Sequence, residues 1–357
     1  MKILRPLSLV LFGLWTATAA AQVSLTPPGP PSPAPSAAKP TPKAHAPAKK
    51  TVAPAATSKP ATTPVAPAVT RTPAPAADDA GVDLVYGAYQ RGMYKTAFDL
   101  ASKRVQDTGD PKAMTMLGEL YANAMGVKRD DAKAADWYKR AAANGDREAM
   151  FALAMLRMAG RGGPVNHEEA AKLLASSAKL GNPKAAYNLA LLYLDGQTLP
   201  QDVRRAAELF RVAADAGNPE AQYALATFYK EGTGVPKDLD KSVRLLQAAS
   251  LADNIDAEVE YAIALYNGNG TTKNEPAAIA LLRKAARQNS PIAQNRLARV
   301  LVSGQATPSD IIEGFKWHLV AKTAGKGDPT LDDALGRLSQ DDRAKAEAAA
   351  RKWLGVR

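Results

Sequence analysis

Pro183–Asn218 reads PKAAYNLALLYLDGQTLPQDVRRAAELFRVAADAGN, which is two apolar segments joined by a loop and closed by Gly-Asn. Ala186, Leu189, Ala190 and Tyr193 fall on one face of a helix, because their spacing follows a period of about 3.6 residues and not the alternation of a strand. The second segment repeats this spacing with alanine, leucine and phenylalanine. We therefore expect two α-helices in this stretch.

The same unit returns every 36 residues, in six copies over Pro111–Asp328. Its third position is always alanine, at Ala113, Ala149, Ala185, Ala221, Ala257 and Ala293. Its seventh position is leucine or tyrosine, at Leu117, Leu153, Leu189, Leu225, Tyr261 and Leu297. One helix pair cannot bury its apolar face alone, so a fixed period of this length indicates helix pairs that stack on one another.

The second helix of each copy has a clear start signal. A short acid or amide recurs at position 20 of the unit, at Asp130, Asn166, Asp202, Asp238, Asn274 and Asp310. Such a side chain accepts hydrogen bonds from the free amides of the helix that it opens. Asn166 is also followed by Glu169 at the spacing of a capping box.

The residues of the unit resemble a known family. The first copy holds the family's residue types at the family's spacing, namely Leu117-Gly118, Tyr121, Gly126-Val127, Trp137-Tyr138 and Gly145-Asp146. The chain resembles the Sel-like repeat (SLR) proteins, which are tetratricopeptide-like (TPR-like). The resemblance implies an all-α fold: a right-handed α-solenoid of stacked helix pairs, with the first helix of each pair on the concave face. The chain departs from the pattern at Arg157, where tyrosine is usual, and in the loop Ser303–Ala306.

The pattern divides the chain into parts with different properties. We expect an export signal at 1–21, a disordered Pro/Ala/Lys-rich linker at 22–77, an N-terminal TPR-like capping helix pair at 78–110, and C-terminal capping helices at 329–357. The six repeats between them are expected at 111–146, 147–182, 183–218, 219–254, 255–290 and 291–328.

The first 21 residues are typical of a secretory signal peptide. Lys2 and Arg5 precede an apolar run at Leu7–Trp15, and Ala19-Ala20-Ala21 offers a cleavage site before Gln22. The run is short for a membrane span, which needs about 20 residues. We expect a periplasmic or secreted protein cleaved after Ala21. The alternative is inner-membrane anchoring by an uncleaved signal.

Most of the net positive charge lies ahead of the repeats. The chain has a formal net charge of +11, but eight basic residues and no acid precede Asp78, which leaves +3 for residues 78–357. The linker holds 15 of the 26 prolines, six basic residues and no aromatic residue. This composition predicts disorder. Export and the absence of aromatic residues argue against nucleic acid as a partner. The basic residues either make weak contacts with anionic envelope polymers or only keep a spacer soluble.

No catalytic, metal or cofactor site is expected. The chain has no cysteine and three histidines. His167 opens a zinc-protease-like sequence, but Ala171 stands where the second histidine is required. Gly268–Lys273 superficially suggests a phosphate loop, although it lacks the Gly-Lys-Ser/Thr ending and occupies a loop position of the unit. His318 replaces a packing leucine, so we interpret it as a partly buried packing residue.

What remains is a surface for binding. If first helices line the concave face, its inward residues form an apolar, methionine-rich strip that is adaptable enough for a peptide or a helix. The alternative is that some of these side chains only pack against neighbouring helices. The candidate partner-binding residues are Phe151, Met155, Met158, Tyr187, Leu191, Leu194, Tyr223, Thr227, Lys230, Ile263 and Tyr266.

These features predict a non-enzymatic periplasmic scaffold or adaptor that holds a protein partner in this groove. The family resemblance implies a regulatory role, for instance in exopolysaccharide control or envelope assembly. A second hypothesis is a cell-wall protein whose basic linker and repeats bind peptidoglycan or a polysaccharide. An enzyme is the third class, and no residue pattern favours it.

Overall fold

The computed structural model describes residues 83–303 and 307–356, which form sixteen α-helices and no strand. The expectations for the export signal, the linker and loop residues 304–306 lie outside this part. The described residues from Ala88 onward belong to one compact unit, and those before Ala88 belong to another. The helices are α1 (Leu84–Gln90), α2 (Tyr94–Thr108), α3 (Pro111–Ala122), α4 (Asp131–Ala143), α5 (Arg147–Ala159), α6 (His167–Lys179), α7 (Pro183–Asp195), α8 (Val203–Asp215), α9 (Pro219–Glu231), α10 (Leu239–Leu251), α11 (Ile255–Asn267), α12 (Glu275–Arg287), α13 (Pro291–Ser303), α14 (Pro308–Thr323), α15 (Pro329–Gly336) and α16 (Gln340–Leu354).

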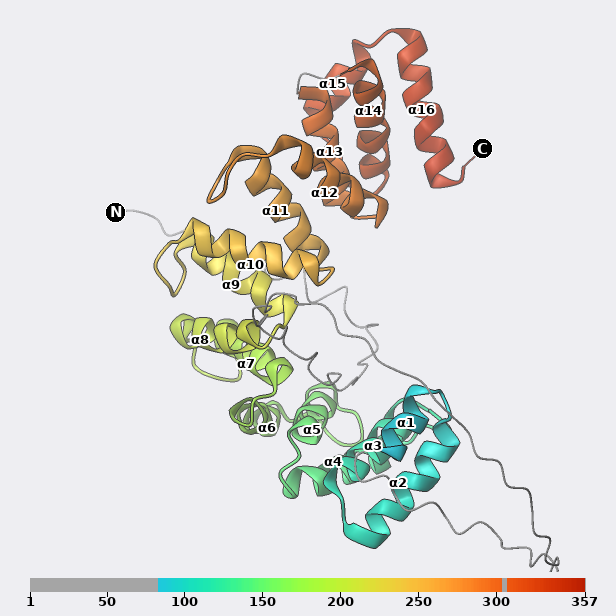
Figure 1. Cartoon of the computed structure of the whole chain (residues 1–357), viewed down its shortest axis with the longest axis vertical. Helices are drawn as coiled ribbons and strands as arrows, with labels where there is room; N and C mark the ends of the chain where they lie inside the picture. The colour runs from blue at the N-terminus through green and yellow to red at the C-terminus, as the bar shows by residue number, and fades with distance from the viewer. Residues whose placement is uncertain (1–82, 304–306, 357) are drawn as a thin grey trace, which may run out of the picture. The chain divides into compact units, whose positions relative to one another are not determined.

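From α3 to α14 the helices pack in the order of the sequence. Each odd-numbered helix packs against the even-numbered helix of its own repeat, and that helix packs against the first helix of the next repeat (Figure 1). We call the odd-numbered members of these pairs first helices and the even-numbered members second helices. The α-solenoid predicted from the 36-residue period is therefore confirmed.

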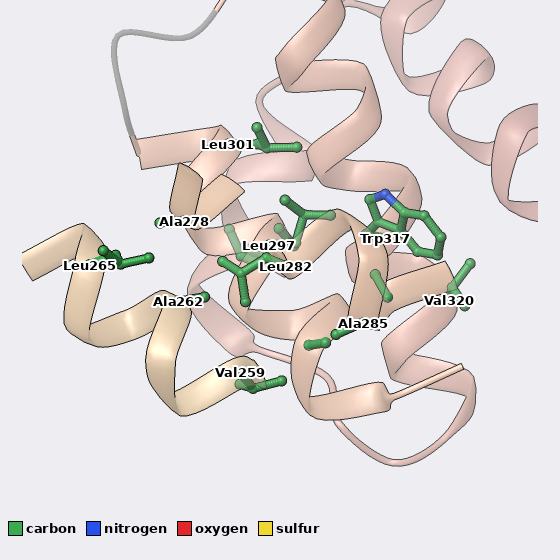
Figure 2. Packing of buried hydrophobic residues seen from close by; sticks show 14 of the residues in the cluster. Val259, Ala262, Leu265, Ala278, Leu282, Ala285, Leu297, Leu301, Trp317 and Val320 are labelled. Atoms are coloured by element: carbon green, nitrogen blue, oxygen red, sulfur yellow. The ribbon is translucent and has the colours of Figure 1, made fainter. Parts of the chain in front are cut away.

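The core is continuous because small side chains let helices approach closely. The alanines at position three are all at most 1% exposed. Two clusters of buried residues illustrate the packing: one surrounds Phe210 in repeats 3 and 4, and the other lies in repeats 5 and 6. Figure 2 shows the second cluster, to which α11, α12, α13 and α14 contribute Val259, Ala262, Leu265, Ala278, Leu282, Ala285, Leu297, Leu301, Trp317 and Val320.

The predicted caps open five of the six second helices. Each side chain accepts a hydrogen bond from the amide three residues later, at Asp130, Asn166, Asp202, Asp238 and Asn274. The prediction is wrong for Asp310. Pro308 starts α14 and Thr307 is its cap, so Asp310 lies inside the first turn and completes a capping box with Thr307. Proline favours the first helical position because its missing amide hydrogen is not needed there.

The departure at Arg157 has a compensating change. In three other repeats, the ring of a tyrosine in the first helix contacts a basic side chain twelve residues later in the sequence. In repeat 4, for example, Nζ of Lys241 lies 5.3 Å from the ring centroid of Tyr229. In repeat 2 the cation is Arg157 itself, and the residue twelve positions later is Glu169. Arg157 Nε lies 3.0 Å from Glu169 Oε2. The cation–π contact is thus replaced by an ion pair that joins the same two helices.

The joint between repeats 4 and 5 contains a buried carboxylate. Position four of the unit is glutamine in repeats 4 and 6. Gln222 and Gln294 each donate from Nε2 to a carbonyl oxygen eight residues earlier, at 3.2 Å. In repeat 5 this position is Glu258, which is 0% exposed and cannot donate when ionised. Its Oε2 instead lies 3.1 Å from Nζ of Lys284, and the hydrogen bond with Glu258 raises the pKa of that lysine.

We expect Lys284→Met to lower the free energy of unfolding by about 2 kcal/mol, because the buried carboxyl group of Glu258 then loses its ion-pair partner. The loss is smaller than for a fully buried pair, since the Lys284 side chain is 42% exposed and water screens it. Adding Glu258→Gln should restore most of the loss, because the amide can donate to the carbonyl of Ser250, eight residues earlier. Urea denaturation of the wild type, both single variants and the double variant measures this. A double variant as unstable as Lys284→Met would contradict it.

The last two helices close the array. Leu331 and Leu335 of α15 and Ala346 and Ala350 of α16 are buried. The sequence predicts a partly buried His318, but this residue of α14 is fully buried. Its Nε2 lies 2.9 Å from Asp332 Oδ1. A histidine in the place of a packing leucine needs such a partner, because a buried polar group without a hydrogen bond is costly.

Candidate partner-binding surface

The eleven residues predicted to bind a partner come from four first helices, α5, α7, α9 and α11, and we call them the first-helix face. They occupy positions five, nine and twelve of the unit. These positions are three or four residues apart, so their side chains follow one side of each helix. Ten of the eleven are partly buried or exposed, and one is buried.

In repeat 3 the face is formed by Tyr187, Leu191 and Leu194. All three are partly buried and pack against the core cluster around Phe210. The ring of Tyr187 lies 5.6 Å from the ring of Phe210 between centroids. Burial raises the pKa of Tyr187, and the nearby Glu220 adds to this effect. The side chains therefore both pack against the second helix and keep part of their surface accessible.

Repeats 4 and 5 continue the face with a polar border. Tyr223 packs on the small cluster between α9, α10 and α11, and Ile263 and Tyr266 pack on the cluster of repeats 5 and 6. Thr227 donates from Oγ1 to the carbonyl of Tyr223 at 3.2 Å. Lys230 is exposed, and its Nζ lies 2.7 Å from Glu260 Oε2. This ion pair joins α9 directly to α11, so the two helices present one connected surface.

Repeat 2 contributes less than expected. Met155 and Met158 are partly buried. Phe151 is only 5% exposed and is a core residue, so its inclusion in the binding surface is corrected here. Tyr187 and Tyr223 occupy the same position of the unit, but each carries a hydroxyl group that favours contact with water. Phe151 lacks this group, and its side chain is buried. Whether the other residues bind a partner stays a prediction.

The electrostatics around Tyr223 were not anticipated from the sequence. Burial, together with the negative charges of Asp256, Glu260 and Glu231, raises the pKa of Tyr223 to about 12. Desolvation raises the pKa of Asp256 above its usual range, and repulsion by Glu260 acts in the same direction. Counting charge over residues 78–357 as a whole hides this, because the acids of two first helices are balanced by bases elsewhere. A count for each helix would have found them.

Residues 83–303 and 307–356 contain no group of three or more His, Cys, Asp or Glu side chains that could hold a metal ion. Gly268–Lys273 is a turn between α11 and α12, as expected. Its lysine lies over the ring of Tyr266 and pairs with Glu275, where Nζ is 2.6 Å from Oε1. Within the same ranges, no helix has the length and apolarity needed to cross a membrane.

Comparisons with known proteins agree with this architecture. The family model of the Sel1 repeat matches six times, at residues 111–146, 147–182, 183–218, 219–254, 255–290 and 291–326. A crystal structure of a Sel1 repeat protein from Oxalobacter formigenes is similar at 25% identity and a TM-score of 0.60, covering 67% of this chain and 98% of that one. A protective antigen of uropathogenic Escherichia coli that displays an SLR fold is similar at 25% identity and a TM-score of 0.52, covering 73% of this chain and 64% of that one. None of the curated proteins matches the chain.

Proposed function

The chain belongs to the Sel1 repeat family, whose helix-pair scaffold is suited to protein–protein interaction, and from this premise we propose a non-enzymatic periplasmic adaptor that binds a protein partner along its first-helix face. The observation that carries the proposal is the continuity of this face. Partly buried tyrosine and aliphatic side chains follow one another from α7 to α11, and the Lys230–Glu260 ion pair connects adjacent repeats. Such a surface offers apolar contact area and free polar groups together, which is typical of protein interfaces.

Periplasmic location rests on the sequence of residues 1–21, with its basic start, apolar run and small-residue cleavage site. In this compartment, an adaptor that regulates envelope or exopolysaccharide functions is the role that we propose. Fractionation of cells followed by mass measurement of the purified protein tests the location. A mature chain that begins at Gln22 in the periplasmic fraction supports it, and an intact chain in the membrane fraction contradicts it.

The binding surface is tested with two matched double variants. Tyr187→Ala with Leu191→Ala truncates the face, whereas Val212→Ala with Leu239→Ala removes apolar atoms from exposed sites on second helices. Both are used as bait in envelope extracts after circular dichroism has confirmed that they are folded. We expect the face variant to recover its partner at least ~10-fold less well, because central apolar anchors dominate binding energy.

The control variant should recover the partner as well as wild type does. Equal recovery by all three proteins would exclude the first-helix face. Sedimentation with purified cell-wall sacculi then tests the alternative of a cell-wall-binding protein. Such a protein should sediment with the sacculi, and deletion of residues 22–77 should abolish this sedimentation.

A further inference from the structure

The charge of the first helices is unevenly distributed. Helices α9 and α11 together contain five acidic residues and one basic residue, whereas the net charge of each of α3, α5, α7 and α13 is zero or positive. The acids are Glu220, Glu231, Asp256, Glu258 and Glu260, and the base is Lys230. The neighbouring helix α13 carries Arg296 and Arg299, so the negative stretch ends there. The acidic character is therefore confined to repeats 4 and 5.

Most of this negative charge is not neutralised within the protein. Glu258 is buried and pairs with Lys284, and Glu260 pairs with Lys230. Glu220, Glu231 and Asp256 are exposed, and within residues 83–303 and 307–356 none of them forms an ion pair. An exposed acid can be left to water at little cost, but three beside one apolar strip create a local negative potential.

The acids border the apolar residues and do not form a separate patch. Glu260 Oε2 lies 2.7 Å from Nζ of Lys230, which belongs to the first-helix face. The negative charges of Asp256, Glu260 and Glu231 also raise the pKa of Tyr223, and Glu220 does the same for Tyr187. Neither tyrosine hydroxyl has a hydrogen-bond partner in the described part of the chain. The surface thus combines two accessible tyrosine rings, aliphatic side chains and uncompensated carboxylates.

Building on the proposed function, we infer that the partner segment bound by α7, α9 and α11 is a basic polypeptide, with lysine or arginine side chains between aliphatic ones. The methylene groups of such a side chain can lie along Tyr223 or Ile263 while its charged end reaches Asp256 or Glu231. The tyrosine rings add favourable contact with cations. The net charge of +3 for residues 78–357 does not attract a basic segment, so the attraction is local to these helices.

The test uses two fluorescein-labelled peptides of about twelve residues with the same leucine spacing. One has lysine at its polar positions and the other has glutamine. The proteins are the full chain, an acid-neutralised variant (Glu220→Gln, Glu231→Gln, Asp256→Asn) and a control (Glu208→Gln, Asp215→Asn, Asp240→Asn). The control changes net charge equally, at exposed acids of second helices. Fluorescence anisotropy gives the affinities at low and high salt.

We expect the lysine peptide to bind wild type and control within about two-fold of each other, and the acid-neutralised variant about ten-fold more weakly at low salt. The glutamine peptide should bind all three weakly. Equal weakening by both charge variants would overturn the inference. It would also be overturned if the glutamine peptide bound wild type as tightly as the lysine peptide did.

Leu191→Ala separates this inference from the proposed function. If Leu191→Ala weakens binding of the glutamine peptide while the charge variants change no affinity, binding along the first-helix face is supported and the inference of a basic partner is wrong. If no variant changes the affinity for either peptide, both are wrong.

Discussion

Phe210→Ala is expected to lower the free energy of unfolding by about 4 kcal/mol, the largest effect of any single substitution considered for this chain. Phe210 is 1% exposed and lies at the centre of the cluster that joins repeats 3 and 4. Its ring centroid is 5.6 Å from that of Tyr187 and 5.5 Å from that of Phe228. Truncation loses the buried ring and leaves a cavity that three helices cannot close without moving.

Val212→Ala is the matched control, because it lies in the same helix and is 51% exposed. It should change stability by less than about 0.5 kcal/mol. Urea denaturation followed by circular dichroism gives both values. If the two variants unfold at the same urea concentration, the assignment of α8 to the core of the array is wrong.

Gly162→Ala is expected to cost about 3 kcal/mol, for two independent reasons. Gly162 has φ +68°, a left-handed conformation that side chains with a Cβ adopt at a cost. A Cβ there would also collide with the carbonyl oxygen of Asp131, the first residue of α4. The loop of repeat 2 would therefore have to move away from repeat 1. Gly145→Ala is the control, because its φ of +85° is similar but no atom lies within 4 Å of the added Cβ; it should cost about 1 kcal/mol.

The same substitution should change the titration of Asp131. In the native loop, Arg161 donates a hydrogen bond to Asp131 and lowers the pKa of this carboxyl to about 2, with Arg129 assisting. A folded-state pKa below the unfolded value stabilises the protein above about pH 4, and the contribution is lost as the pH falls toward 2. Displacing the loop in Gly162→Ala should raise the pKa of Asp131 toward 3.8, which NMR titration can follow. The difference in unfolding free energy between wild type and Gly162→Ala should therefore become smaller as the pH falls over the same range.

An unchanged Asp131 titration in Gly162→Ala would show that the loop tolerates the methyl group without moving. A loss of stability in Gly162→Ala equal to that in Gly145→Ala would lead to the same conclusion. The chain already places Asp253 and Asn289 in left-handed conformations where other repeats have glycine equivalent to Gly145. Crowding, and not the backbone angle alone, therefore distinguishes Gly162.

Much of the fold could be predicted from local signals that repeat. The alanine at position three and the acid or amide at position 20 recur in each copy, so an error in one copy is corrected by the others. Asp310 shows where this fails. In repeat 6 the sequence Thr307-Pro308 supplies a stronger start three residues earlier, and extrapolation from the other repeats overlooked it. The charge exchange at Arg157 and Glu169 also needed the structure, because it depends on two helices that face each other.

The candidate surface was less predictable than the fold. Position in the repeat indicates the side of a helix on which a residue lies, but not how deeply its side chain is buried. Phe151 and Tyr187 are equivalent by position, yet the first is buried and the second keeps part of its surface accessible. The acids around Tyr223 lie on two helices that are 36 residues apart in sequence, and only their proximity in space gives them a shared effect.

Binding of a protein partner along the first-helix face is the central claim, and site-specific photo-crosslinking in living cells tests it most directly. A photoreactive amino acid is introduced singly at Leu194, Thr227 or Lys230 on the face, and at Glu208 or Asp240 on exposed sites of second helices. The account predicts that all three face positions crosslink to one protein of the same mass and that neither second-helix position does. Crosslinks confined to the second-helix positions, or none from the face, would contradict it.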